Sequence, residues 1–73
     1  MSNIRELLEE ELQIKDHLYE FRFELYSHNR TKNKYITHLL KNGATIEQLV
    51  QQNNKDLDYT QSQIIKLRRL LKN

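Results

Sequence analysis

Apolar side chains recur along the first third of the chain with the period of an α-helix. They step by three and four residues through Ile4, Leu7, Ile14, Leu18, Phe21 and Leu25, and only Glu11 interrupts the row. This a/d pattern of a heptad repeat predicts one long helix over residues 3–28. Other apolar residues beside the row widen its surface (Leu8, Leu12, Tyr19, Phe23 and Tyr26). We therefore expect the helix to pack on two sides, once within its own chain and once against a second copy.

Start and stop signals place further helices along the chain. Asn3 is a favourable N-cap, and the polar segment 27–31 predicts a turn. A second helix, Thr31–Lys41, then ends at Asn42-Gly43, which is the usual composition of a helix C-cap. The chain therefore turns at least twice.

The second half of the sequence predicts two more helical segments. Thr45 and Gln48 have capping-box spacing and start a short third helix. The polar run QQNNK at 51–55 predicts a weakly structured connection. A final helix is expected from about residue 56 to residue 71.

Composition favours helices throughout, because the 73 residues include no proline and one glycine. The fold class predicted is all-α, a small bundle or hairpin of three to four helices. A domain of this size buries little core, and it has no cysteine for disulfides. We therefore expect a homodimer, with residues 1–55 as the dimerisation body and residues 56–73 as a partner-binding helix. The residues expected in the core or dimer interface are Leu7, Ile14, Leu18, Phe21, Leu25, Tyr35 and Leu39.

The segment SQIIKLRRLLKN at 62–73 combines aliphatic side chains with bases and has no acid. On a helix it forms a basic amphipathic surface, which can lie in a partner's groove and select that partner by charge. The residues expected to bind the partner are Ile64, Ile65, Lys66, Leu67, Arg68, Arg69, Leu70, Leu71 and Lys72.

Charge alternates in blocks although the net charge is only +2. Residues 1–29 carry seven acids and three bases, residues 30–41 carry four bases, and residues 59–73 carry four bases. Such blocks favour antiparallel pairing of acidic with basic segments, within a chain or between chains. Solvated helix faces of different sign would give the same pattern.

The sequence offers no catalytic or metal-binding constellation. His17, His28 and His38 are 11 and 10 residues apart, which is not the spacing that brings two imidazoles to one metal. The paired carboxylates, Glu9–Glu11, lie on a helix that offers no cleft to separate their pKa values. We expect neither an enzyme nor a cofactor. Without an apolar run of ~20 residues or a signal peptide, we also expect a cytoplasmic protein that binds no membrane.

Two other binding modes are less favoured alternatives. Residues 38–49, HLLKNGATIEQL, have the helix–glycine–helix order of a helix-turn-helix DNA-binding regulator, and Gln48, Gln51 and Gln52 could contact bases. The helix after the glycine has no base of its own to hold phosphates, which weighs against nucleic acid. The basic end of the chain could instead lie on an anionic membrane, although it lacks Trp and Phe anchors.

Together with the acidic, aromatic first helix and the total length, the segment SQIIKLRRLLKN resembles the capsid morphogenesis B proteins of staphylococcal pathogenicity islands. The resemblance implies an internal scaffolding protein of a mobile genetic element. Such proteins are helical dimers whose C-terminal helix binds the inner surface of a helper bacteriophage's major capsid (coat) protein. They redirect assembly from large to small capsids in the cytoplasm of the bacterial host, and are present transiently in procapsids. The resemblance thus implies coat protein as the partner of Ile64–Lys72.

Overall fold

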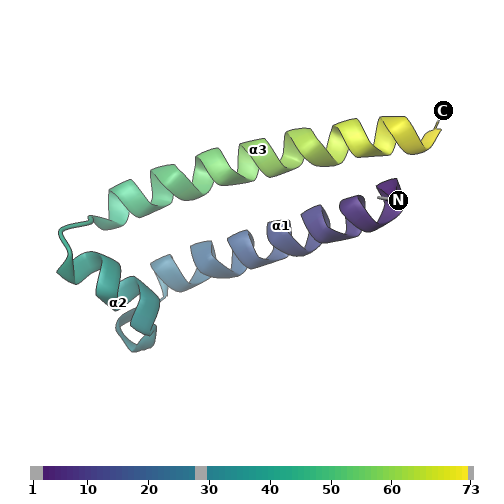
Figure 1. The fold of residues 1–73 in the computed structure, drawn as a ribbon. Coiled ribbons are helices and arrows are strands. Elements are labelled where there is room, and N and C mark those ends of the chain that lie inside the picture. Colours follow the sequence, from purple (N-terminus) through teal and green to yellow (C-terminus); the bar gives the residue numbers. More distant parts are fainter. Residues whose placement is uncertain (1–2, 28–29, 73) are drawn as a thin grey trace.

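The computed structural model describes residues 3–27 and 30–72, which form a helical hairpin (Figure 1). The elements are α1 (Ile4–Tyr26), a 3₁₀ turn η1 (Arg30–Lys32), α2 (Lys34–Lys41) and α3 (Ile46–Lys72). α1 and α3 run antiparallel, and α2 lies at the end of the hairpin where α1 finishes. The described residues contain no strand, so the all-α prediction is confirmed.

Asparagine side chains start the first two helices. Asn3 Oδ1 accepts a hydrogen bond from the Arg5 amide at 2.9 Å, as predicted for an N-cap. α2 begins later than predicted, because Asn33 Oδ1 accepts from two amides of its first turn, at 3.0 and 3.1 Å. The preceding residues form η1 instead of helix. Positions 28 and 29 of the turn predicted at 27–31 lie outside the described residues.

The connection from α2 to α3 has the predicted chemistry. Gly43 has φ of +95°, a conformation that costs other residues energy. Its amide donates to Leu40 O, and the Ala44 amide donates to Leu39 O, which is the bond pair of a Schellman motif. Immediately afterwards Thr45 Oγ1 and Gln48 Oε1 accept from each other's amides at 3.1 and 3.0 Å, so the capping box is confirmed.

The break predicted at 51–55 is wrong. α3 continues through QQNNK without interruption for 27 residues. Most side chains of this run are exposed and leave the helical backbone bonds intact, whereas Asn53 is buried and its polar atoms are hydrogen-bonded. The boundary between residues 55 and 56 therefore lies inside α3, and the division into two domains remains a prediction.

α1 and α3 meet along two rows with alternating steps of four and three. Every member of these rows is buried or half-buried: Ile4, Leu8, Glu11, Lys15, Leu18, Arg22 and Leu25 on α1, and Ile46, Val50, Asn53, Leu57, Thr60, Ile64 and Leu67 on α3. This spacing is that of an antiparallel coiled coil. This row shares Ile4, Glu11, Leu18 and Leu25 with the predicted heptad row, whereas the other members of the predicted row, Leu7, Ile14 and Phe21, lie beside the contact with α3.

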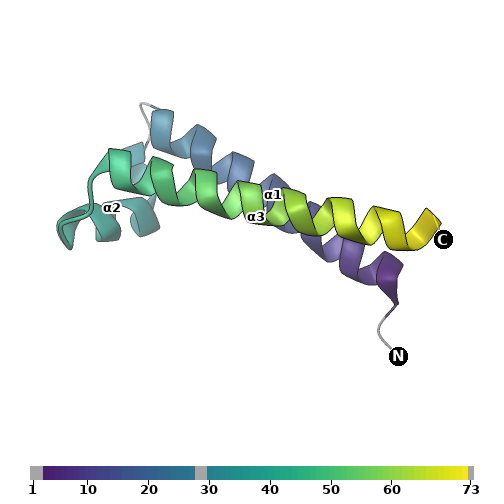
Figure 2. The ribbon, with the colours of Figure 1, turned by 90° about the horizontal axis from the view of Figure 1, so that it is seen from above.

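The core is small and the molecule is elongated. The fully buried aliphatic side chains are Leu25, Ile36 and Ile64, and Leu57 is almost as buried. The radius of gyration is 15.1 Å, whereas a compact domain of this length has about 11 Å. Seen from above, α2 projects to one side of the hairpin (Figure 2).

Candidate functional site

A buried asparagine fixes the register of α1 against α3. Asn53 Nδ2 donates to Leu18 O at 2.9 Å, and Arg22 Nε donates to Asn53 Oδ1 at 2.9 Å. Both groups of the Asn53 amide are therefore satisfied, although only 2% of the residue is exposed. A polar residue at one core position is a known device for specifying register. Here it places Leu18 opposite Asn53.

This register leaves the last turn of α3 without a facing helix. Because both helices rise equally per residue, Ile4 at the start of α1 lies opposite Leu67. Residues 68–72 of α3 extend past that point, and we call them the overhang. Figure 1 shows the corresponding end of α3 reaching beyond α1.

The overhang and the turn before it expose aliphatic side chains. Ile65 is 42% exposed, Leu70 53% and Leu71 43%. Leu67 is half-buried in the contact with α1. Ile64 is fully buried, so its predicted contact with a partner does not fit this structure, because a core side chain cannot reach a second surface without opening the hairpin.

The bases of the segment remain at the surface. Lys66, Arg68, Arg69 and Lys72 are all exposed. Within residues 3–27 and 30–72 these four side chains have neither an ion pair nor a hydrogen-bonding partner. Their charge is therefore available to an acidic surface. The α3 tip, defined as Ile65–Lys72, thus combines exposed aliphatic and cationic groups.

The residues predicted for the core or dimer interface are distributed over two environments. Leu25 is core, as predicted, while Leu18, Phe21 and Leu39 are half-buried. The remaining members, Leu7, Ile14 and Tyr35, are exposed. Phe21 and Tyr35 are in contact, with ring centroids 6.0 Å apart. Assignment of the exposed members to a dimer interface remains a prediction.

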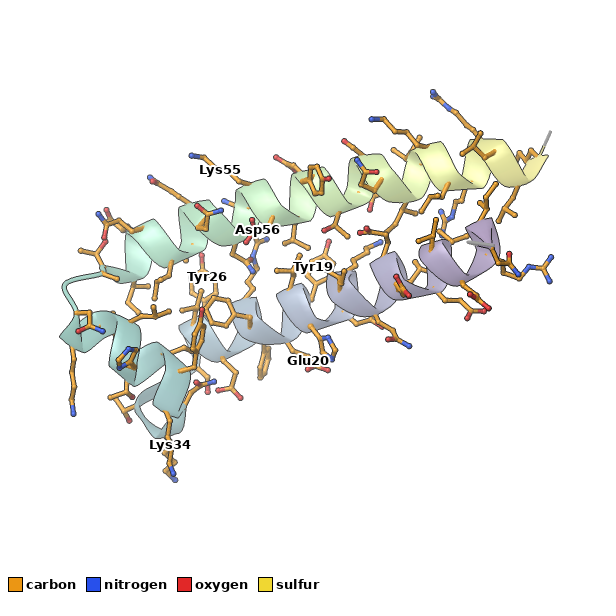
Figure 3. All side chains as sticks on the ribbon, in the orientation of Figure 1. Tyr19, Glu20, Tyr26, Lys34, Lys55 and Asp56 are labelled. Atoms are coloured by element: carbon orange, nitrogen blue, oxygen red, sulfur yellow. The ribbon has the colours of Figure 1, made fainter. Side chains whose placement is uncertain are left out.

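Sequence reasoning missed the part played by Arg22 and Asn53. The signal was the row of steps of four and three on α3, which continues from Val50 through Asn53 to Leu57. The polarity of QQNNK concealed that period. Figure 3 shows the resulting alternation at two later residues of α3: Lys55 points away from the hairpin, whereas Asp56 points toward α1.

The segment considered for DNA binding forms the turn between α2 and α3 and the start of α3. Gln48, Gln51 and Gln52 are exposed there. Gln48 is part of the capping box, and Gln52 Nε2 donates to Asp56 Oδ1 at 3.0 Å. Two of the three candidate base-contacting side chains thus already have local partners.

Surface hollows in the hairpin are shallow. The hollow bounded by Leu18, Phe21, Tyr35 and Leu49 has a volume of about 220 Å³, less than a typical small-molecule site. No group of three His, Cys, Asp or Glu side chains converges as metal ligands within the part of the chain that the structure describes. In the same ranges, no helix combines the length and hydropathy needed to cross a membrane.

Comparison with known proteins identified no relative, since no family model, curated protein or solved structure matches this chain.

Proposed function

We propose that this chain is a homodimeric internal scaffolding protein that binds a bacteriophage coat protein through the α3 tip and redirects assembly to small capsids. The observation that carries the proposal is the exposure of Ile65, Leu70 and Leu71 beside four bases that have no acidic partner among the described residues. The choice of coat protein as the partner comes from the resemblance of residues 62–73. The site of action proposed is the host cytoplasm and, transiently, the procapsid.

The chemistry of the α3 tip suits a contact of moderate strength. Each aliphatic side chain contributes about 1.5–3 kcal/mol if it becomes fully buried. The bases would meet acidic groups of the coat protein and contribute mainly to specificity and to salt sensitivity. A single tip therefore binds weakly enough to be released when the shell matures.

A dimer makes such contacts effective by presenting two tips. Once one tip is bound, the second binds at a high effective concentration, provided that the spacing of the tips matches that of the coat subunits. A rigid helical body between the tips then constrains the angle between neighbouring subunits. A smaller angle closes a smaller shell.

Shell diameter, measured by electron microscopy, tests the proposal. A staphylococcal phage coat protein and its own scaffold are expressed with and without this chain. We expect small closed shells only when the chain is present. The double variant Arg68→Glu/Arg69→Glu should restore large shells, because it replaces two cations of the tip with acids.

The matched control is Lys34→Glu/Lys41→Glu, which makes the same change of charge on exposed residues of α2. It should still give small shells. Unchanged shells with the wild-type chain would exclude the proposal, and salt-dependent binding of DNA would then favour the helix-turn-helix alternative. If both double variants abolish small shells, the effect is one of net charge and not of the α3 tip.

A further inference from the structure

One face of the hairpin carries apolar side chains that are for the most part exposed. It comprises Leu7, Ile14 and Phe21 of α1, Tyr35 of α2 and Tyr59 of α3, and we call it the outer face. Leu7 is 39% and Ile14 45% exposed, Tyr35 and Tyr59 are each more than half exposed, and Phe21 is half-buried. Ile14 and Tyr59 border one hollow, and Phe21 and Tyr35 border the next. The outer face therefore extends along the hairpin.

The chain exposes more surface area than a compact monomer of the same mass. The accessible surface is 6066 Å², whereas a compact monomer of 8.9 kDa exposes roughly 4,800 Å². The excess of roughly 1,250 Å² is larger than the area of about 800 Å² that each partner contributes to a standard interface. A second copy that forms an interface of standard size on the outer face would cover most of this excess.

The spacing of the apolar residues on α1 makes the outer face complementary to itself. Leu7, Ile14 and Phe21 are seven residues apart, so they follow one line along the helix. When two such lines run antiparallel with Ile14 opposite Ile14, Leu7 of each copy meets Phe21 of the other. A two-fold interface requires such reciprocal contacts, in which residue i of one copy meets residue j of the other and residue j meets residue i.

Polar residues in the same row match in this arrangement. Glu10 and His17 lie on either side of Ile14 and are exposed. In the antiparallel arrangement Glu10 of one copy comes within one residue of the position opposite His17 of the other, so a carboxylate lies near a potential hydrogen-bond donor. In a parallel arrangement each Glu10 would instead face its own counterpart, and the two negative charges would repel.

The position of α2 also favours the antiparallel arrangement. Tyr35 and Leu39 of α2 border the same hollow as Phe21, so α2 stands on the outer face at one end of the hairpin (Figure 2). In a parallel dimer the ends of the two hairpins that carry α2 would lie side by side, and the two α2 helices would occupy the same space. In the antiparallel dimer each α2 lies beside Leu7 of the other copy.

We propose that a second copy of this chain packs on the outer face in antiparallel orientation, with the two-fold axis passing beside Ile14, to give a four-helix core of two α1 and two α3 helices. The two α3 tips then lie at opposite ends of the dimer and can reach two separate partner molecules. This interface rests on the homodimer of the proposed function and specifies its geometry. It does not depend on what the tips bind.

Molar mass in solution tests the interface. Light scattering should give twice 8.9 kDa for the wild-type chain. Ile14→Asp should halve that mass, because it places two carboxylates at the axis. The control is Phe23→Asp on the same helix, where Phe23 is 77% exposed and lies away from the outer face. A wild-type monomer, or a dimer that Ile14→Asp leaves intact, would overturn the proposal.

Cross-linking tests the orientation and does not depend on whether Ile14→Asp folds. The chain has no cysteine, so the single-cysteine variants Glu10→Cys and His17→Cys each carry one thiol. Under oxidation, an equimolar mixture should give a covalent heterodimer, whereas Glu10→Cys alone should not cross-link. In the antiparallel dimer the two thiols of Glu10→Cys lie on opposite sides of Ile14 along the α1 helix axis. They are then too far apart for a disulfide, which needs Cα atoms within about 7 Å.

Cross-linking of Glu10→Cys alone, without the mixed product, would show a parallel dimer and overturn the orientation. Both experiments use the isolated chain. Their failure is therefore distinct from failure of the coat-protein proposal, which shell diameter measures.

Discussion

The two ends of the hairpin contain similar aliphatic residues in opposite environments. At the end covered by α2, Leu25 and Ile36 are fully buried. At the overhang, Leu70 and Leu71 are about half exposed. α2 packs at the first end with the end of α1 and the start of α3, whereas α3 alone extends past the start of α1 at the second.

The difference shows that a leucine on an amphipathic helix acquires its role from what faces it. At the covered end, burial of aliphatic groups stabilises the fold. At the overhang, the same groups are exposed beside bases and can contribute to binding instead. Stability and recognition are therefore expected to respond to different substitutions.

The largest expected change in stability is at Leu25, and a comparison with Leu70 tests whether stability and recognition depend on different residues. Leu25→Ala should lower the free energy of unfolding by about 2–5 kcal/mol, because it removes buried methyl groups and leaves a cavity. Leu70→Ala should change it by less than about 0.5 kcal/mol, as is usual for surface positions. Urea unfolding followed by circular dichroism measures both. Equal losses at the two positions would contradict the comparison.

The polar contact between the two ends should give the next largest effect. Asn53→Asp should cost about 1–3 kcal/mol, because a carboxylate cannot donate to Leu18 O and instead places an acceptor oxygen against that carbonyl. The neighbouring Asn54→Asp, which is exposed, is the matched control and should change stability little. Thermal unfolding at constant chain concentration measures the difference. Equal melting temperatures for the two variants would show that the Asn53 contacts do not stabilise the hairpin.

The turn that brings α2 onto the covered end should be sensitive to the residue at Gly43. Gly43→Ala should destabilise the fold by about 1–2 kcal/mol through its positive φ, since no atom lies within 4 Å of an added Cβ. Gly43→Asn should cost less, because asparagine tolerates this conformation better. Chemical denaturation can compare the two variants. A larger loss with Asn than with Ala would argue against a conformational origin.

The smallest effect is expected at the overhang. Arg68→Glu/Arg69→Glu should lower stability by less than about 1 kcal/mol, because it exchanges favourable for unfavourable interactions with the helix C-terminus only at exposed positions, where such interactions are weak. The helical circular dichroism signal should be unchanged. A large loss of helicity would mean that the bases of the overhang stabilise the fold and are not reserved for a partner.

Local features of the fold were predictable because they depend on neighbouring residues. The Asn3 cap, the Gly43 turn and the Thr45–Gln48 box each involve residues within a few positions of one another. The face of α1 that packs against α3 was not predicted. Leu7 and Leu8 are both suitable for that contact, and the heptad row through Leu7 was assigned to the core or dimer interface without a choice between them. The structure buries the row through Leu8 against α3.

The candidate site was predictable in its composition and less so in its exposure. The pattern SQIIKLRRLLKN identified a basic, aliphatic helix, and α3 extends through it to Lys72. Which aliphatic residues are available to a partner depends on register. Ile64 lies opposite α1 and is buried, whereas Ile65, one residue further, faces solvent.

The sequence by itself therefore determined the helical class, the caps, the glycine turn and the basic amphipathic end, because these follow from propensity and short-range hydrogen bonds. Only the tertiary structure decided that QQNNK continues a helix, that Asn53 sets the register and that α3 overhangs α1. Those outcomes depend on contacts such as that between Arg22 and Asn53, which are 31 residues apart. A one-residue shift in the helix contact changes which side chains are buried, and no local signal specifies that shift.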